Sequence, residues 1–153
     1  MKHYYFAYGS NMNPANVKSR GLVFNSLQWG RMRSVKLAFN KLACDRPSCS
    51  YANVVYAKNS YVEGVLYQLV DENQIAKLDD YETTPRFYSR DYFPIEVSDG
   101  SARTAWVYIA NRAVIVEGLL PEVSYMTHLL AAEAYLSHGY FQMLMNQPVK
   151  PVE

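Results

Sequence analysis

Apolar and polar positions along the chain predict strands first and helices last. Residues 3–8 form an apolar run that stops at a glycine, as a strand buried on both faces would. Residues 34–41 alternate apolar and polar side chains, which is typical of a half-buried strand. An Asp-Gly pair within residues 98–101 predicts a hairpin turn. Similar runs predict further strands at residues 51–57, 61–70, 86–97 and 102–110.

Two short helices are predicted between these strands. The first starts at an Asn-Pro pair, with Asn13 at the N-cap and Pro at the first helical position, and it ends at Arg-Gly, residues 20–21. The second covers residues 71–82, with Asp71 as its capping residue. Inside the strand before it, Gly64 indicates either a bulge or a close approach of another backbone.

The C-terminal part is predicted to be helical from residue 122 to residue 145, with a break near Gly139. Strands followed by terminal helices indicate an α+β fold with a mixed or antiparallel sheet. Glycines and prolines inside several strands are compatible with a curled sheet or a small β-barrel. No repeat or linker interrupts residues 1–153, so a single domain is expected.

Charge and composition exclude some partners. Fifteen basic and fourteen acidic residues give a formal net charge of +1, and no dense basic cluster suggests nucleic acid. The nearest basic stripe fits the solvent face of a strand, and it consists of Arg31, Arg33, Lys36 and Lys41. With no signal peptide and no apolar stretch of about 20 residues, we expect no membrane association and a cytoplasmic location.

Tyrosines and cysteines leave more than one interpretation open. The 14 tyrosines could pack the strands with their hydroxyls hydrogen-bonded, or they could line a pocket, and composition does not decide between the two. Cys44 and Cys49 are the only cysteines, and we expect reduced thiols. A cysteine hydrolase would need a histidine beside one of them, and no motif supports this. No spacing typical of a zinc site occurs either.

One carboxylate is predicted to face inward. On the helix over residues 71–82, Glu82 follows Ile75 by seven positions and Leu78 by four, so it shares their apolar face. Burial and the negative end of the helix dipole would both raise its pKa towards the range of a general base. The alternatives are a pair with Arg86 or Arg90, or exposure at the end of the helix.

The turn after the first strand is a candidate anion site. Gly9 permits a positive φ or a close approach, and the backbone amides of residues 9–11 can surround a carboxylate. The sequence matches neither a P-loop nor a dinucleotide-binding motif. An ordinary Asx-type turn is the alternative interpretation.

Several segments together resemble the gamma-glutamylcyclotransferase family. "FAYGSNM" is similar to its YGSN loop, and "VEGVLYQLVDENQIAKLDDYE" to its strand and short helix ending in a catalytic Glu. "TPRFYSR" and "EVSYMTHLLAAEAYL" follow in the family's order. Two departures are visible: Thr83 stands where relatives commonly have Gly, and the segment over residues 82–88 is one residue shorter than in many relatives.

The resemblance implies an α+β fold with a small β-barrel flanked by short helices. It also implies formation of 5-oxoproline from a small-molecule γ-glutamyl compound, with Glu82 as general acid and base and with no cofactor or metal. Substrate binding is implied for Tyr8, Gly9, Ser10, Asn11, Met12, Tyr88 and Tyr125. The sequence does not identify the amine that leaves. A non-catalytic protein that binds γ-glutamyl or amino-acid-like ligands is the alternative.

Overall fold

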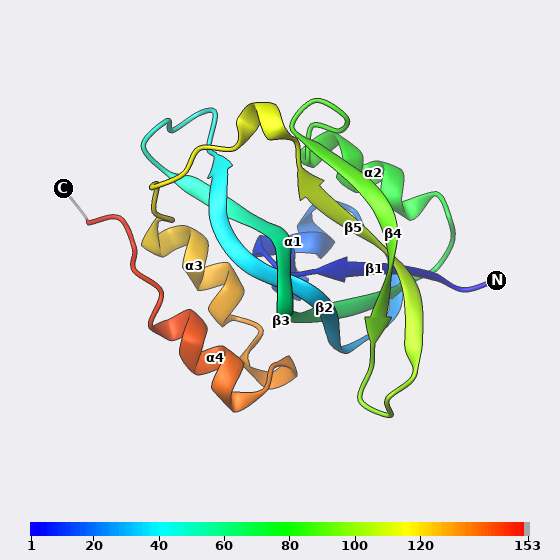
Figure 1. Ribbon diagram of the computed structural model, residues 1–153. Helices are drawn as coiled ribbons and strands as arrows, with labels where there is room; N and C mark the ends of the chain where they lie inside the picture. The colour runs from blue at the N-terminus through cyan, green and yellow to red at the C-terminus, as the bar shows by residue number, and fades with distance from the viewer. Residues whose placement is uncertain (152–153) are drawn as a thin grey trace.

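A closed five-stranded barrel forms the centre of the computed structural model, which describes residues 1–151 (Figure 1). Neighbouring strands are antiparallel except β1 and β5, which are parallel. The barrel order is β1-β3-β2-β4-β5, which confirms the α+β barrel prediction. The strands are β1 (His3–Ala7), β2 (Phe24–Leu42), β3 (Ser50–Leu69), β4 (Tyr88–Glu96) and β5 (Ala102–Ala110).

Short helices flank the barrel. In Figure 1, α3 and α4 lie along one side and α2 lies on the opposite side. No helix within residues 1–151 is long and apolar enough to cross a lipid bilayer. The α-helices are α1 (Pro14–Ser19), α2 (Gln74–Tyr81), α3 (Val123–Leu130) and α4 (His138–Met145). Single 3-10 turns are η1 (Ser10–Met12), η2 (Arg112–Val114) and η3 (Glu133–Tyr135).

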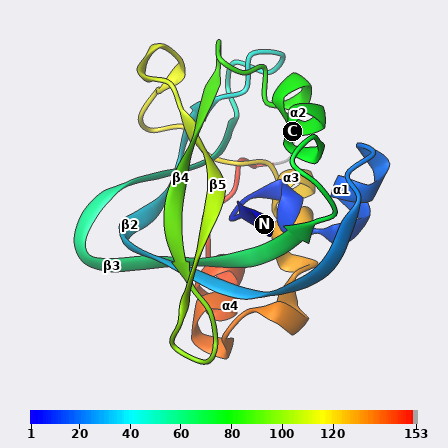
Figure 2. The same cartoon turned by 90° about the vertical axis from the view of Figure 1, so that its right-hand side faces the viewer.

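Strands β2 and β3 are longer than the sequence pattern predicted. β2 begins at Phe24 rather than near residue 34, and the two strands expected at 51–57 and 61–70 are one continuous β3. Pairing is interrupted locally between the Arg33–Tyr61 and Val35–Tyr56 pairs, where the register shifts and Ser34 and Asn59 take positive φ values of 65° and 63°, and it resumes on both sides. The polar residues before 61 therefore mark a bend in a continuous ribbon, not a turn between strands, and Figure 2 shows the two strands bending together.

Gly64 is required by a close backbone approach. A β-carbon there would lie 2.2 Å from the carbonyl oxygen of Ala7 and 2.9 Å from the ring of Phe6. The β2–β3 register runs without interruption through the Gly30–Gly64 pair. Of the two predictions for Gly64, close approach is confirmed and the bulge is wrong.

The helix boundaries confirm one predicted cap and correct another. Asn13 caps α1, because its Oδ1 accepts a hydrogen bond from the Ala15 amide at 3.1 Å. Asp71 does not cap α2, which begins at Gln74; its carboxylate instead accepts from the Asn73 amide at 2.9 Å in the preceding turn.

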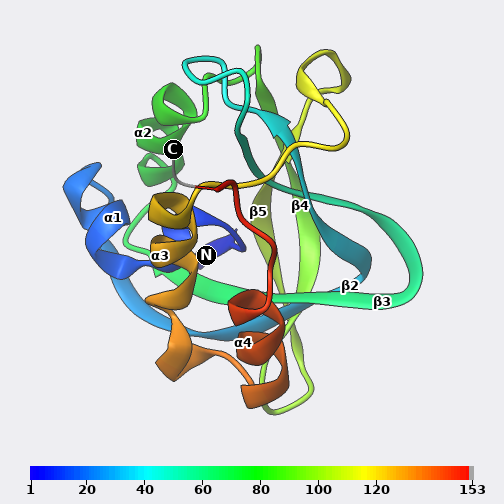
Figure 3. The same ribbon diagram turned by 90° about the vertical axis from the view of Figure 1, so that its left-hand side faces the viewer.

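The terminal helix breaks earlier than predicted. The interruption lies between Leu130 and His138, and Gly139 sits inside α4. The Ser137 hydroxyl accepts from the Tyr140 amide at 3.3 Å and so starts the second helix, which is why the break falls before the glycine. Figure 3 shows the chain turning between α3 and α4.

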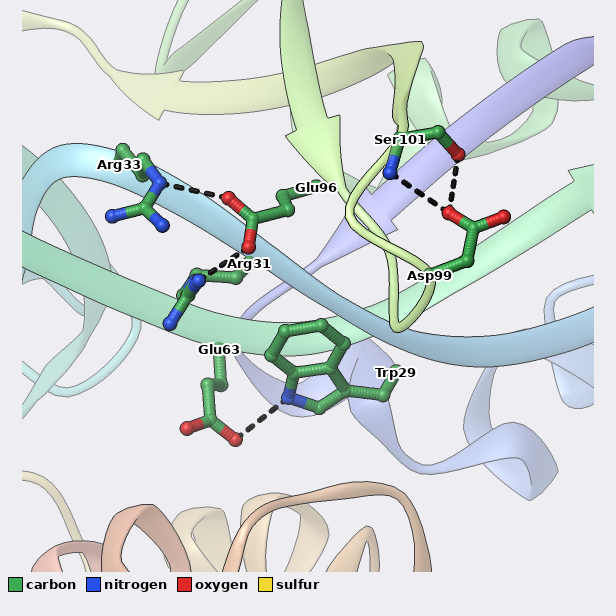
Figure 4. Close-up of polar contacts among 7 residues, drawn as sticks. All are labelled: Trp29, Arg31, Arg33, Glu63, Glu96, Asp99 and Ser101. Atoms are coloured by element: carbon green, nitrogen blue, oxygen red, sulfur yellow. Dashed lines mark hydrogen bonds and ion pairs between the residues drawn. The ribbon is translucent and has the colours of Figure 1, made fainter.

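Buried and half-buried carboxylates connect the barrel to its surroundings (Figure 4). Glu63 is 2% exposed and accepts from the Trp29 indole at 2.8 Å and the Ser137 amide at 2.8 Å, which ties β2 and β3 to the start of α4. The hydrogen-bonding capacity of this carboxylate is thereby used by structural partners.

A second carboxylate joins β4 to β2. Glu96 pairs with Arg31 and also with Arg33, the latter at 2.8 Å, where the register places Arg31 opposite Glu96 (Figure 4). In the predicted hairpin turn, the Asp99 carboxylate accepts from the Ser101 amide at 2.8 Å and Gly100 has a φ of 86°. These contacts hold β4 between its two neighbours and so keep the barrel closed.

Candidate active site

One cavity of about 620 Å³ lies at the end of the barrel where β1 stops. Its walls come from the turn after β1, the C-terminal end of α2, the end of β2 and the start of α3. Met12 does not line it but is fully buried in the core. The other sequence-predicted site residues all border the cavity: Tyr8, Gly9, Ser10, Asn11, Glu82, Tyr88 and Tyr125.

Asn11 is the most firmly fixed residue of the predicted anion loop. Its side chain is 3% exposed, donates to the Tyr5 hydroxyl at 3.0 Å and accepts from Arg20 at 2.6 Å. Its carbonyl accepts from the Tyr67 hydroxyl at 2.7 Å. Contacts with strands and with α1's C-cap therefore hold this loop, which goes beyond an isolated Asx-type turn.

Gly9 is needed because a tyrosine approaches it. Its φ is −115°, so a positive φ is not the reason. A β-carbon would lie 2.9 Å from the hydroxyl of Tyr125 and 3.3 Å from the β-carbon of Ala52. The Tyr125 hydroxyl accepts from the Ala52 amide at 3.0 Å, and the Tyr88 hydroxyl donates to the Ala52 carbonyl at 2.9 Å. Both tyrosines are thereby held on β3 beside the loop.

Glu82 faces the cavity, as its helical spacing predicted. It is the C-cap of α2 and half-buried, and its Oε1 lies 3.5 Å from the Asn11 side-chain nitrogen. Arg90 instead forms an ion pair with Asp79 at 2.7 Å, and Arg86 is exposed over a phenylalanine ring. Within residues 1–151 no ion pair includes Glu82, so the pairing alternatives are wrong.

The Glu82 carboxyl has the pKa of a neutral-pH acid and base. Burial raises its pKa to about 7, while the charges of Arg20 and Lys41 lower it and Asp79 raises it. Both protonation states are then populated near neutrality. Burial, and after it the Glu82 charge, raise the pKa of Tyr5 and Tyr8 well above the ordinary value, so these phenols stay neutral donors.

Thr83 occupies a left-handed position directly after Glu82. Its φ is 52°. Its amide donates to the Asp80 carbonyl at 3.3 Å, and the Thr84 amide donates to the Asp79 carbonyl at 2.9 Å. These two bonds form a Schellman motif, whose left-handed residue is usually glycine. The departure noted in the sequence therefore leaves the turn intact but places a β-branched residue in a strained conformation.

Replacing Thr83 with glycine should raise the free energy of unfolding by about 0.5–1 kcal/mol, since the strain of a β-branched residue there exceeds the added entropy of glycine. Chemical denaturation at neutral pH measures this. Thr83→Ala, which keeps a β-carbon but removes the branch, should fall between the two proteins. A Thr83→Gly variant that is less stable than the wild type would show that the backbone at Thr83 is not strained.

Lys41 is the cavity residue that sequence reasoning misplaced. It was assigned to a solvent-facing basic stripe, but it is only 4% exposed and lines the cavity. Lys36 on the same strand is exposed, as predicted. The β2–β3 register shifts between Ala38 and Lys41, and the consecutive residues Asn40 and Lys41 are both buried, so the alternation of faces expected for a regular strand is broken there. The strand pattern in the sequence therefore contained no signal for the burial of Lys41.

The barrel and its carboxylate-bearing cavity define a class of small α+β proteins, and comparison places the chain within it. The family model "Gamma-glutamyl cyclotransferase, AIG2-like" matches residues 5–127. The chain therefore belongs to the gamma-glutamyl cyclotransferase, AIG2-like family. No curated protein sequence matches it.

Solved structures show the same fold at low sequence identity. A structure named gamma-glutamyl cyclotransferase has a TM-score of 0.84 and 20% identity, covering 99% of this chain and 91% of that one. An uncharacterized protein from Homo sapiens, loc79017, has a TM-score of 0.84, 19% identity and the same coverage. A glutathione-specific gamma-glutamyl cyclotransferase from yeast has a TM-score of 0.71 and 10% identity, covering 94% of each chain.

Proposed function

We propose that this protein is a gamma-glutamylcyclotransferase that converts a γ-glutamyl compound to 5-oxoproline and releases an amine. The observation that supports this most is Glu82, a carboxyl with a pKa of about 7 that faces the Gly9–Asn11 loop across one cavity. Family membership supports the same reaction type. In this reaction Glu82 transfers the protons and the Gly9–Asn11 loop binds the substrate.

The reaction needs few catalytic groups because its nucleophile belongs to the substrate. The α-amine nitrogen attacks the γ-carbonyl carbon, a five-membered ring closes, and the bond from that carbon to the leaving nitrogen breaks. Ring closure is intramolecular, so holding the folded conformer supplies much of the acceleration. Glu82 takes a proton from the α-ammonium group and gives it to the leaving nitrogen. The second proton, which the ring nitrogen loses when it becomes an amide, also passes to the released amine, which leaves as an ammonium ion, so Glu82 returns to its starting state.

The Gly9–Asn11 loop is proposed to hold the glutamyl part of the substrate. Its amides can bind either the α-carboxylate or the oxyanion that develops at the γ-carbonyl. Arg20 supports either role, because it holds the Asn11 side chain at 2.6 Å and places a positive charge behind the loop. The Asn11 side-chain nitrogen, between Tyr5 and Glu82, is proposed to orient the substrate.

The test is direct detection of 5-oxoproline. The purified protein is incubated with γ-glutamyl-alanine, γ-glutamyl-ε-lysine, γ-glutamyl-ethylamine and glutathione, and the product is measured by mass spectrometry. We expect catalytic turnover of at least one compound. Binding of these compounds by calorimetry without turnover would instead favour the alternative of a non-catalytic binding protein on this fold.

A further inference from the structure

The ammonium group of Lys41 has no protein partner among residues 1–151. The residue as a whole is 4% exposed, no hydrogen bond or ion pair involves its nitrogen in the described part of the chain, and that nitrogen is not among the fully buried polar atoms there. The residue lines the cavity that also holds Glu82. A charge on a residue that is mostly removed from solvent and has no counter-ion is costly. An anionic group of a ligand in the cavity would offset that cost.

Aromatic rings fix where this ammonium lies. Its nitrogen is 4.8 Å from the ring centre of Phe87, 5.3 Å from that of Tyr51 and 5.6 Å from that of Tyr88. Such contacts stabilise a cation but offer no acceptor in line with its N–H groups. The three rings therefore hold the charge at one wall of the cavity and leave its donors available.

The other cations that border the cavity already have partners. Arg20 donates to Asn11 and lies over the Tyr81 ring. Arg46 pairs with Glu122 at 2.7 Å. Among the cations lining the cavity, Lys41 is thus the one without a partner in the described chain.

Lys41 and Arg20 come from different parts of the cavity wall. Arg20 lies behind the Gly9–Asn11 loop, where the glutamyl part is proposed to bind. Lys41 lies at the end of β2, beside the Cys44–Arg46 segment at the cavity wall. It acts electrostatically on Glu82 yet forms no ion pair with it. A group attached to the leaving nitrogen, which Glu82 protonates, therefore lies in the same cavity as the unpartnered ammonium group of Lys41.

We propose that Lys41 binds a carboxylate carried by the leaving amine, so that the substrates are γ-glutamyl α-amino acids rather than γ-glutamyl derivatives of neutral amines. This rests on the proposed function. In an α-amino acid the carboxylate is one carbon from the leaving nitrogen. Lys41 then both selects the substrate and positions the leaving nitrogen near Glu82.

A binding experiment tests this without relying on turnover. Calorimetry compares Glu82→Gln with Glu82→Gln/Lys41→Met, using γ-glutamyl-alanine and γ-glutamyl-ethylamine, which differ only in the leaving amine's carboxylate. A charge-assisted hydrogen bond of usual strength corresponds to about 10–100-fold in affinity. We expect Lys41→Met to lower the affinity for γ-glutamyl-alanine by about that factor. The affinity for γ-glutamyl-ethylamine should stay the same, so the preference for γ-glutamyl-alanine falls by the same factor.

Matched variants control for folding and net charge. Lys41→Arg should restore most of the preference, while Lys36→Met removes an exposed charge from the same strand and should not change it. If Lys41→Met does not fold, as judged by circular dichroism, Lys41→Gln takes its place. Equal loss for both compounds would assign Lys41 to the glutamyl carboxylate and overturn the proposal. The proposal would also be overturned if Lys41→Met lost no affinity for γ-glutamyl-alanine, or if γ-glutamyl-alanine did not bind at all.

Calorimetry together with the 5-oxoproline assay distinguishes the carboxylate site from the cyclotransferase activity. Selective binding through Lys41 with no 5-oxoproline from the wild-type protein would refute the cyclotransferase activity and leave the carboxylate site in place. If instead wild type and Lys41→Met turn over both compounds with the same preference, the carboxylate site is refuted and the cyclotransferase activity stands.

Discussion

Glu82→Gln should reduce kcat for 5-oxoproline formation by about 10²–10⁴-fold, the usual contribution of a positioned acid–base group. Glutamine has nearly the same shape and can keep the contact with Asn11, but it cannot accept the ammonium proton. We therefore expect the affinity for a γ-glutamyl substrate to change little. Steady-state kinetics and calorimetry on the same preparation separate the two quantities.

A neighbouring carboxylate supplies the control for this variant. Glu72 is exposed just before α2 and does not line the cavity, so Glu72→Gln should keep wild-type kinetics. A Glu82→Gln protein that retains activity within a few-fold of wild type would refute the assigned role. The proton would then have to move through another group.

The second large effect concerns stability and pH. The folded-state pKa of Glu82 is about 7, against an ordinary value of 4.5, so ionisation is less favourable in the folded state than in the unfolded one. The contribution of Glu82 to stability therefore falls as pH rises from about 4.5 to about 7, and its full penalty applies above that range. Glu82→Gln lacks this penalty, and its advantage should grow by up to about 3 kcal/mol between pH 4.5 and pH 8.

Urea denaturation of both proteins across this pH range measures the difference. Other titrating groups affect both proteins alike, so they cancel when the two curves are subtracted. A difference that is constant with pH would mean that Glu82 titrates at its ordinary value. A difference that shrinks as pH rises would contradict the sign of the shift.

Local patterns in the sequence predicted the parts of the site that depend on local geometry. Ile75 and Leu78 define a helix face, and the helical repeat alone directed Glu82 inward. The apolar run before Gly9 likewise predicted where β1 ends. The fold class followed from the order of strands and helices, and the family resemblance sharpened it to a barrel.

What could not be predicted depends on contacts between distant residues. Gly9 needs its missing β-carbon because of Tyr125, more than a hundred positions later, and no local pattern contains that relation. The β2–β3 ribbon continues past a register shift in which Ser34 lies opposite residues 57–60, and a polar stretch in the sequence does not distinguish such a bend from a turn. Lys41 is buried by rings from two other strands and the segment before β4, so its role emerges only when the barrel is closed.

The place of β1 in the barrel has a consequence for how the protein folds. β1 pairs with β3 on one side and meets β5 on the other, where Tyr5 lies opposite Trp106. Contacts between such distant segments close slowly, because the loop entropy is lost before the contacts form. The Gly9–Asn11 loop follows β1 directly, so half of the site at the start of the chain gains its final shape only after residue 110 has been synthesised. On the ribosome, β1 is thus made well before β5 but becomes ordered only together with it.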